Sequence, residues 1–315
     1  MSESAISLFC FKRHTKMNVP AESGALLLLA THRGESLILK KVFTPLLLCF
    51  VLVEQCHAWG HEGHRLTALV AQEHLSPTAE ENIRYLLGKE SLADVASWAD
   101  EYREDHRETA RWHYVDIPGA QDTYDRVRDC PLPAEDAASR WRDCMVDRIL
   151  YFEEQLKDPA RDKKQKAFAL KFLVHLMGDI QQPFHAISDA RGGNNVQVMF
   201  FGTAQCGERS ICNLHGIWDD GLLQHRDLSE KKYLARLHSE IIENDWEKQS
   251  GGDPVLWANA SHHYAQDAFV PNGALITSQY YEVEIKIVDQ QLALGGLRLA
   301  EVLNGIFIES PLPRP

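Results

Sequence analysis

The chain has 315 residues, of which 44% are hydrophobic and 25% charged, a composition typical of a globular protein rather than a disordered or low-complexity one. Its 33 Lys and Arg stand against 45 Asp and Glu, and the net charge of −12 excludes a polybasic coat for nucleic acid. Fifteen His make metal chemistry the first hypothesis to examine.

The N-terminal part of the sequence predicts a secretory signal peptide. Residues 42–53 are apolar, follow Lys40 and Lys41, and lead to small residues at Cys56 and Ala58. Twelve apolar residues are too few to span a bilayer comfortably, so an uncleaved membrane anchor is the less favoured alternative. We predict a leader over residues 1–58, cleaved after Ala58, and a mature domain over residues 59–315 without a stable membrane span.

Helical periodicity covers most of the mature chain. It predicts helices over residues 60–73, 77–87, 92–102, 134–156, 164–182, 217–225, 231–244, 254–269 and 281–307. Residues 104–133 and 186–214 are rich in Gly, Pro, Asn and Asp and are predicted to be irregular, with a strand over residues 196–201 and a small β-hairpin there. No repeat or linker divides the sequence, so we predict a single all-α, multi-helix domain.

The cysteines of the mature chain favour an oxidising compartment. Four remain after residue 58, and an even number in a secreted chain favours two disulfides. Cys130 with Cys144 and Cys206 with Cys212 is the simplest of three connectivities. Asn259 opens a glycosylation sequon. The expected location is the secretory pathway, either outside the cell or in the lumen of the endoplasmic reticulum.

Two His-x-x-x-Asp pairs point to a metal site. His175 and Asp179 lie one turn apart on the predicted helix 164–182, and His215 and Asp219 repeat the spacing. One such pair is more often a hydrogen-bonded core pair, but a second makes coincidence a poor explanation. His185 follows Pro183, which is expected to end or kink the helix and return His185 to the same space. Nitrogen and carboxylate ligands without thiolate suit zinc with an open, hydrolytic position.

Upstream residues add weaker candidates. Asp100 has Arg103 three residues later on a predicted helix, and alone this would be a surface ion pair. His113 lies in a stretch that we predict to be extended, beside Tyr114 and Asp116. Alone, His113 would be a structural histidine.

Taken together, these segments carry a resemblance to a known family. The whole mature chain resembles the zinc-dependent, single-strand-specific class I nucleases, which include bifunctional 3′-nucleotidase/nucleases and belong with zinc phospholipase C in one all-α superfamily. The matching segments, in family order, are residues 59–64, 97–100, 112–116, 175–185, 192–194 and 213–219.

The resemblance implies three zinc ions. It places Asp100, His113, His175 and Asp179 around the first ion, and His185, His215 and Asp219 around the third. Asp179 would bridge to a second ion, which is also held by His64 and by the α-amino nitrogen and carbonyl oxygen of Trp59. An α-amine is available only after the preceding peptide bond is cut, and the predicted cleavage site lies there.

The resemblance also implies the reaction. A zinc-bridging hydroxide would attack phosphorus, with Asp179 bridging the ions, Asp100 orienting the hydroxide and Arg103 stabilising phosphoryl charge. Tyr114 would stack on an unpaired base and Asp116 would bind its edge, with help from Asn194. The expected substrates are single-stranded DNA and RNA, cleaved to 5′-phosphorylated products, and 3′-nucleotides.

Two other functional classes remain open, and the enzyme is expected to be a monomer. A zinc-dependent phospholipase C would share the metal shell, but Tyr114 and Asp116 speak against it. A zinc-storage protein would need neither Arg103 nor an open coordination position.

Overall fold

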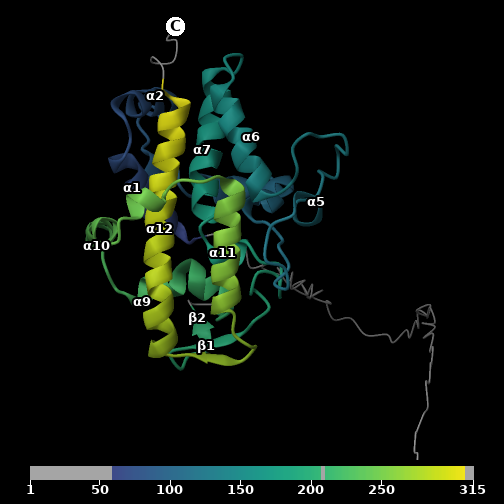
Figure 1. Ribbon diagram of the computed structural model, residues 1–315, viewed down its shortest axis with the longest axis vertical. Helices are drawn as coiled ribbons and strands as arrows, with labels where there is room; N and C mark the ends of the chain where they lie inside the picture. Colours follow the sequence, from purple (N-terminus) through teal and green to yellow (C-terminus); the bar gives the residue numbers. More distant parts are fainter. Residues whose placement is uncertain (1–58, 207–209, 309–315) are drawn as a thin grey trace, which may run out of the picture. The chain divides into compact units, whose positions relative to one another are not determined.

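The computed structural model of the protein describes residues 59–206 and 210–308 (Figure 1). The predicted leader and its cleavage site lie outside the described residues. The α-helices are α1 His61–Glu73, α2 Pro77–Leu87, α3 Leu92–Val95, α4 Trp98–Asp105, α5 Arg126–Asp129, α6 Met145–Lys157, α7 Lys163–Asp179, α8 Leu214–Gly216, α9 Leu222–His225, α10 Glu230–Glu243, α11 Pro254–Ala268 and α12 Ser278–Ile306. The 3₁₀ turns are η1 Arg107–His113, η2 Pro183–His185 and η4 Trp246–Gln249, and η3 Ile217–Gly221 is π-helical. The all-α prediction is confirmed.

Local capping chemistry sets several helix starts where the sequence predicts them. The Ser76 hydroxyl accepts a hydrogen bond from the Ala79 amide at the start of α2, with Pro77 in the first turn. The Asp253 carboxylate accepts from the amides of Val255 and Leu256 at the start of α11. These caps satisfy amides that have no partner inside the helix.

The predicted helix over residues 92–102 is interrupted. α3 ends at Val95 and α4 begins at Trp98. The Asp100 amide bonds to the Ser97 carbonyl (3.1 Å), and the Ala96 carbonyl, which an unbroken helix would use, accepts instead from His175 Nδ1 (2.7 Å). A tertiary hydrogen bond thus takes the place of a helical one.

The predicted helix over residues 134–156 begins only at Met145. Its first part is a loop closed by the disulfide Cys130–Cys144, in which the Asp143 amide donates to the Pro131 carbonyl (2.8 Å) and Arg142 donates to the Cys130 carbonyl (2.8 Å). These contacts keep the loop out of the helical conformation. The predicted disulfide pairing is confirmed here and at Cys206–Cys212.

Two further predictions around the site need correction. α7 ends at Asp179 rather than at residue 182, because Pro183 restricts Gln182 to an extended conformation. His113, expected in an extended stretch, is the last residue of η1, and the extended backbone begins only at Tyr114.

The strands are short and lie together at one end of α12 (Figure 1). β1 Val198–Phe200, inside the predicted strand, pairs in parallel with β4 Ala274–Ile276, which the sequence did not predict. The predicted hairpin lies further along, where β2 Gln205–Cys206 and β3 Ser210–Ile211 pair antiparallel.

The long helix α12 packs along α1 and also contacts α7 and α10 (Figure 1). A Cβ at Gly296 would lie 2.5 Å from Val70 Cβ, so α12 and α1 approach as closely as they do because this position is glycine. The buried apolar side chains of the described residues form two hydrophobic clusters, and side chains of α12 belong to both of them. This packing fixes α1 and α7, which carry His64, His175 and Asp179. No helix of the described residues is long and apolar enough to cross a membrane.

Candidate metal centre and nucleotide pocket

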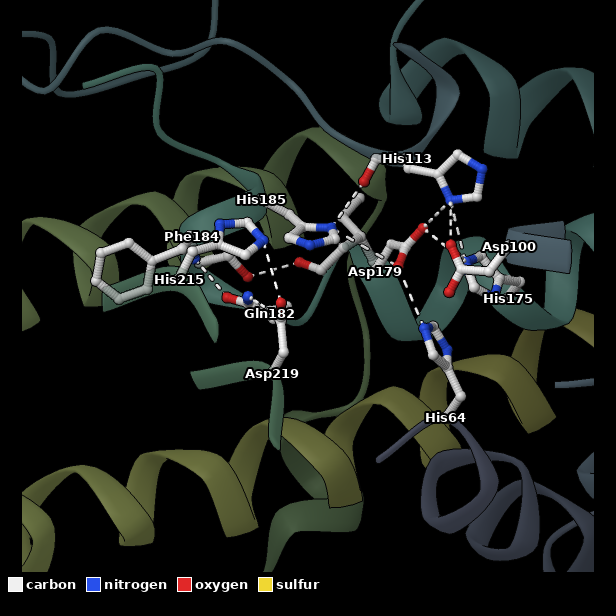
Figure 2. A network of polar contacts seen from close by, with 12 residues as sticks. His64, Asp100, His113, His175, Asp179, Gln182, Phe184, His185, His215 and Asp219 are labelled. Carbon is white, nitrogen blue, oxygen red and sulfur yellow. Dashed lines mark hydrogen bonds and ion pairs between the residues drawn. The ribbon is translucent and has the colours of Figure 1, made fainter. Parts of the chain in front are cut away.

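Asp179, the last residue of α7, lies at the centre of a buried polar cluster (Figure 2). Its Oδ2 lies 3.1 Å from His113 Nδ1 and 3.2 Å from His175 Nε2. Its Oδ1 lies 3.4 Å from His64 Nε2 and 3.7 Å from His185 Nδ1. The two carboxylate oxygens therefore face different pairs of imidazoles, which is the arrangement that a bridging ligand requires.

The structure brings the predicted first ligand set together around Asp179. His113 Nδ1 and His175 Nε2 are 3.0 Å apart, and Asp100 Oδ1 is 3.7 Å from each of them. The Arg103 guanidinium, which is itself buried, lies 3.0 Å from Asp100 Oδ1. η1, α7 and α4 each supply part of the set.

A second set forms around the π-helical turn η3. His215 Nε2 lies 3.4 Å from Asp219 Oδ2, and the rings of His185 and His215 stack with centroids 5.1 Å apart. Gln182 Nε2 donates to Asp219 Oδ1 (2.5 Å). Oxygen and nitrogen atoms of His185, His215 and Asp219 lie close enough together to hold one ion.

Backbone carbonyls orient three of the imidazoles. The Nδ1 atoms of His175, His185 and His215 bond to the carbonyls of Ala96 (2.7 Å), His113 (2.8 Å) and Gly192 (2.6 Å). Such bonds fix the tautomer and leave Nε2 available as a metal ligand.

Burial keeps most of these imidazoles neutral. It lowers the pKa of His64 and of His215 to about 4, and that of His185 to about 3. It lowers the pKa of His113 as well. Neutral imidazole is the form that binds metals.

His175 and Asp179 form the charged pair of the cluster. Burial alone would lower the pKa of His175, but the carboxylates of Asp179 and Asp100 outweigh it and raise the pKa to about 9. Burial alone would raise the pKa of Asp179, but the charge of His175 and hydrogen bonds from the imidazoles hold it well below its usual range. Burial raises the pKa of Asp219, whose carboxylate has no cation beside it among the described residues.

These residues fit a metal better than a hydrogen-bonded core. Both ring nitrogens of His64, the Oδ1 of Asp179 and the Nε2 of His215 are buried and form no hydrogen bond with the described residues. Leaving such atoms unsatisfied costs about 1–3 kcal/mol each, and a cation would satisfy them. The donors are nitrogen and oxygen, since the cysteines of the described chain form disulfides.

His64 reaches the cluster from the first turn of α1, and Trp59 lies just before this helix. A Cβ at Gly178 would lie 2.6 Å from His64 Nδ1, so the glycine makes room for the imidazole against α7. Trp59 is fully buried, and the next amide, that of Gly60, donates to the Asp219 carbonyl (3.0 Å). The role of Trp59 as a main-chain ligand stays a prediction.

A pocket of about 380 Å³ opens over the cluster. Arg103 and three imidazoles of the cluster line it, those of His113, His185 and His215. The lining also includes all three residues predicted to bind the nucleoside, Tyr114, Asp116 and Asn194. Asp116 forms an ion pair with Arg111 (3.0 Å). The pocket has the size of a small-molecule site and places an aromatic ring beside the imidazoles of the cluster.

Comparison with known proteins identifies the family. Residues 59–308 match the S1/P1 nuclease family. Nuclease PA3 from Penicillium sp. and nuclease P1 from Penicillium citrinum are each 30% identical to the chain over 279 residues, which cover 79% of this chain and 97% of theirs. Endonuclease 2 from Arabidopsis thaliana is 30% identical over 276 residues, covering 80% and 91%.

The chain belongs to the S1/P1 nuclease family. Membership confirms the predicted family and the predicted enzyme class, a nuclease acting on phosphodiesters, and it does not favour the phospholipase alternative.

The structure also places at the site three residues to which the sequence assigned no role, Gln182, Arg107 and Arg191. Gln182 holds Asp219, and the only sequence signal was its place between Asp179 and Pro183. Arg107 and Arg191 also line the pocket. Arg107 lies in a region that the sequence predicts to be irregular, so no sequence signal marked it, and the loop that places Arg191 could not be predicted either.

Proposed function

We propose that this family member is a zinc-dependent nuclease that cleaves single-stranded DNA and RNA to 5′-phosphorylated products and removes phosphate from 3′-nucleotides. One observation carries the proposal. The buried Asp179 cluster continues, through His113 and His185, into a pocket that also holds Tyr114 and Asp116. Metal-ligating groups and a base-stacking ring thus share one cavity.

We propose three zinc ions. The first would be held by Asp100, His113, His175 and Asp179, the second by Asp179, His64 and the main chain of Trp59, and the third by His185, His215 and Asp219. Zinc, when bound, lowers the pKa of water and stabilises negative charge on phosphoryl and leaving oxygens. The unsatisfied nitrogens of His64 and the two-sided contacts of Asp179 support a second ion beside the first.

Asp100 and Arg103 would act on the reacting phosphate. Arg103 lines the pocket and lies 3.0 Å from Asp100, so its guanidinium is already placed between the cluster and the cavity. From there it can donate to the phosphoryl oxygens, where charge develops. Asp100 would accept a hydrogen bond from the attacking water and so orient it.

Tyr114, Asp116 and Asn194 would bind the nucleoside. Stacking on Tyr114 needs a base that is out of a duplex, which is the physical reason for a single-strand preference. The ion pair with Arg111 holds the Asp116 carboxylate at the pocket, where it can accept from a base edge. Asn194 donates to the Arg191 carbonyl (2.9 Å), which keeps its amide at the rim.

We further propose that the enzyme is a monomer that enters the secretory pathway and is secreted or retained in the lumen. Both disulfides support this route, and the family match begins at Trp59, directly after the predicted cleavage site. Asn259 lies within α11, where its Oδ1 accepts from the Tyr124 amide and Ser261 is buried. A glycan at this sequon would therefore have to be attached before the chain folds.

A substrate panel tests the proposed function. The mature enzyme is incubated with single-stranded DNA, RNA, 3′-AMP, 5′-AMP and phosphatidylcholine, with and without a chelator. We expect hydrolysis of the first three only, and its loss with chelator followed by recovery on adding zinc. Equal turnover of 5′-AMP would contradict the proposed orientation of the nucleotide, and hydrolysis of phosphatidylcholine would favour the phospholipase instead.

A further inference from the structure

Two arginines of the pocket have side chains that make no hydrogen bond or ion pair with the described residues. Among the arginines of residues 59–206 and 210–308, only Arg107 and Arg191 make neither a side-chain hydrogen bond nor an ion pair. Both are exposed, and both line the cavity above the metal cluster. Among the described residues, these two positively charged side chains therefore remain unpaired at the pocket where the proposed substrate would bind.

The acidic groups nearest in sequence are engaged elsewhere. The Glu108 carboxylate contacts His106 (3.1 Å), and the Asp189 carboxylate accepts from the Gly119 amide (2.6 Å). Neither neutralises its neighbouring arginine. The guanidinium groups of Arg107 and Arg191 are therefore available to an anion in the pocket.

The backbone holds Arg191 firmly in place. Residues 190–193 all have positive φ, and the Arg191 amide donates to the Ser188 carbonyl (3.0 Å). The Arg191 carbonyl accepts from Asn194, and the next carbonyl, that of Gly192, orients His215. Ala190 and Arg191 thus keep a backbone conformation that is unfavourable for residues other than glycine, at the point where the charged side chain of Arg191 lines the pocket.

Their role follows from the charge of the molecule. The mature chain has 27 Lys and Arg against 41 Asp and Glu, so its overall field opposes a polyanion. A 3′-mononucleotide brings one phosphate, which Arg103 and the metal cluster would serve. The unpaired guanidinium groups of Arg107 and Arg191 beside that site are suited to bind the additional phosphates that a longer strand carries.

We propose that Arg107 and Arg191 bind phosphates of the strand next to the scissile one, and so favour oligonucleotides over 3′-mononucleotides as substrates. This inference rests on the proposed function. The contacts would be made to the sugar–phosphate backbone, which carries no base information, so they would not change base preference.

The test compares the zinc-loaded wild type with Arg107→Gln, Arg191→Gln and the double variant. The measured quantity is the ratio of kcat/KM for decathymidylate to kcat/KM for 3′-AMP, at several KCl concentrations. We expect the ratio to fall roughly tenfold in the double variant at low salt. The slope of log kcat/KM for decathymidylate against log [KCl] should become shallower by about 0.7 for each phosphate that the variant no longer binds.

Arg84→Gln is the matched control, because Arg84 is exposed on α2, pairs with Glu80 (2.7 Å) and lies outside the pocket lining. It removes the same charge and should leave the ratio and the slope unchanged. An unchanged ratio in the double variant, or an equal change in Arg84→Gln, would overturn the inference. Failure of the wild type to cleave decathymidylate would instead refute the proposed function.

Discussion

At the scale of single residues, Asp179 is the side chain on which most of the cluster depends. Its Oδ2 faces His113 and His175, and its Oδ1 faces His64 and His185. Asp179→Asn should lower kcat/KM on single-stranded DNA by at least about 100-fold, since even residues that only support metal ligands contribute about 10–100-fold. It should also lower zinc content by more than one ion per chain.

His185→Ala is the comparison variant, because His185 belongs to one proposed ion only. It should lose one zinc ion and retain more activity than Asp179→Asn. Metal analysis of both purified variants, beside their kinetics, provides the measurement. Equal zinc content and equal residual activity in the two would rule out a bridging carboxylate.

A substitution of Tyr114 tests whether substrate binding can be changed without changing metal binding. Its ring lines the pocket, while its neighbour His113 faces Asp179. Tyr114→Ala should weaken binding of single-stranded substrate by about 1–3 kcal/mol because the stacking surface is removed, with zinc content unchanged. Tyr114→Phe keeps the aromatic face and should retain most of the affinity. Loss of zinc in Tyr114→Ala would show instead that the ring supports His113 structurally.

At the scale of elements, the sequence predicts a helix where the local signals agree and fails where a tertiary contact decides. Ser76 and Asp253 cap helices at the predicted positions. The break at Ala96 depends on a hydrogen bond from His175, 79 residues away. The late start of α6 depends on the disulfide at Cys144, and β4 pairs with a strand far along the chain. Periodicity contains none of these long-range contacts.

The contact between α1 and α12 gives a prediction of stability. A Cβ at Gly296 would meet Val70 Cβ at 2.5 Å and the Thr67 carbonyl oxygen at 2.7 Å, and the latter cannot move aside. Gly296→Ala should destabilise the protein by about 1–3 kcal/mol. Gly305, on the same helix with open space around it, is the control. Gly305→Ala should stabilise by about 0.5–1 kcal/mol in denaturant titrations, and equal effects of both changes would contradict this account.

We expect Glu284, on α12, to make the stability of the protein depend on pH. Burial, with a smaller contribution from Asp267 on α11, raises its pKa from 4.5 to about 7. The folded state therefore keeps a proton that the unfolded state releases, and stability is lost as the pH rises from about 4.5 through about 7.

Glu284→Gln removes this dependence because the amide is uncharged at every pH. The variant should have a higher Tm than the wild type at about pH 8, where the half-buried carboxylate is ionised, and nearly the same Tm at about pH 4.5. Glu282→Gln, at an exposed position of the same helix, is the control. A difference in Tm that is constant across this range would refute the assignment to Glu284.

At the scale of the whole molecule, the sequence predicted that the side chains proposed as ligands would come together, but not which backbone groups support them. Helical spacing placed His175 with Asp179 and His215 with Asp219, and the structure brings these pairs into one buried region. The carbonyl that orients His185 comes from His113, 72 residues away. Such partners are backbone groups, which every residue possesses, so no residue type marks them in a sequence.

The last prediction links processing of the chain to its metal content. Trp59 is fully buried at the start of α1, and Gly60 is tied to the Asp219 carbonyl. The first residue of the mature chain would thus be fixed beside the cluster. A free α-amine and the carbonyl of the same residue can chelate an ion, whereas an amide nitrogen is a poor donor, so an uncut leader should leave the ion at His64 under-coordinated. A mature chain beginning at Trp59 should bind three zinc ions, and one that keeps a Met before Trp59 should fold, bind fewer and cleave single-stranded DNA slowly. Metal analysis and kinetics on both forms, with circular dichroism to confirm equal folding, make the comparison. Equal zinc content and equal turnover would mean that Trp59 is a core residue and not a ligand.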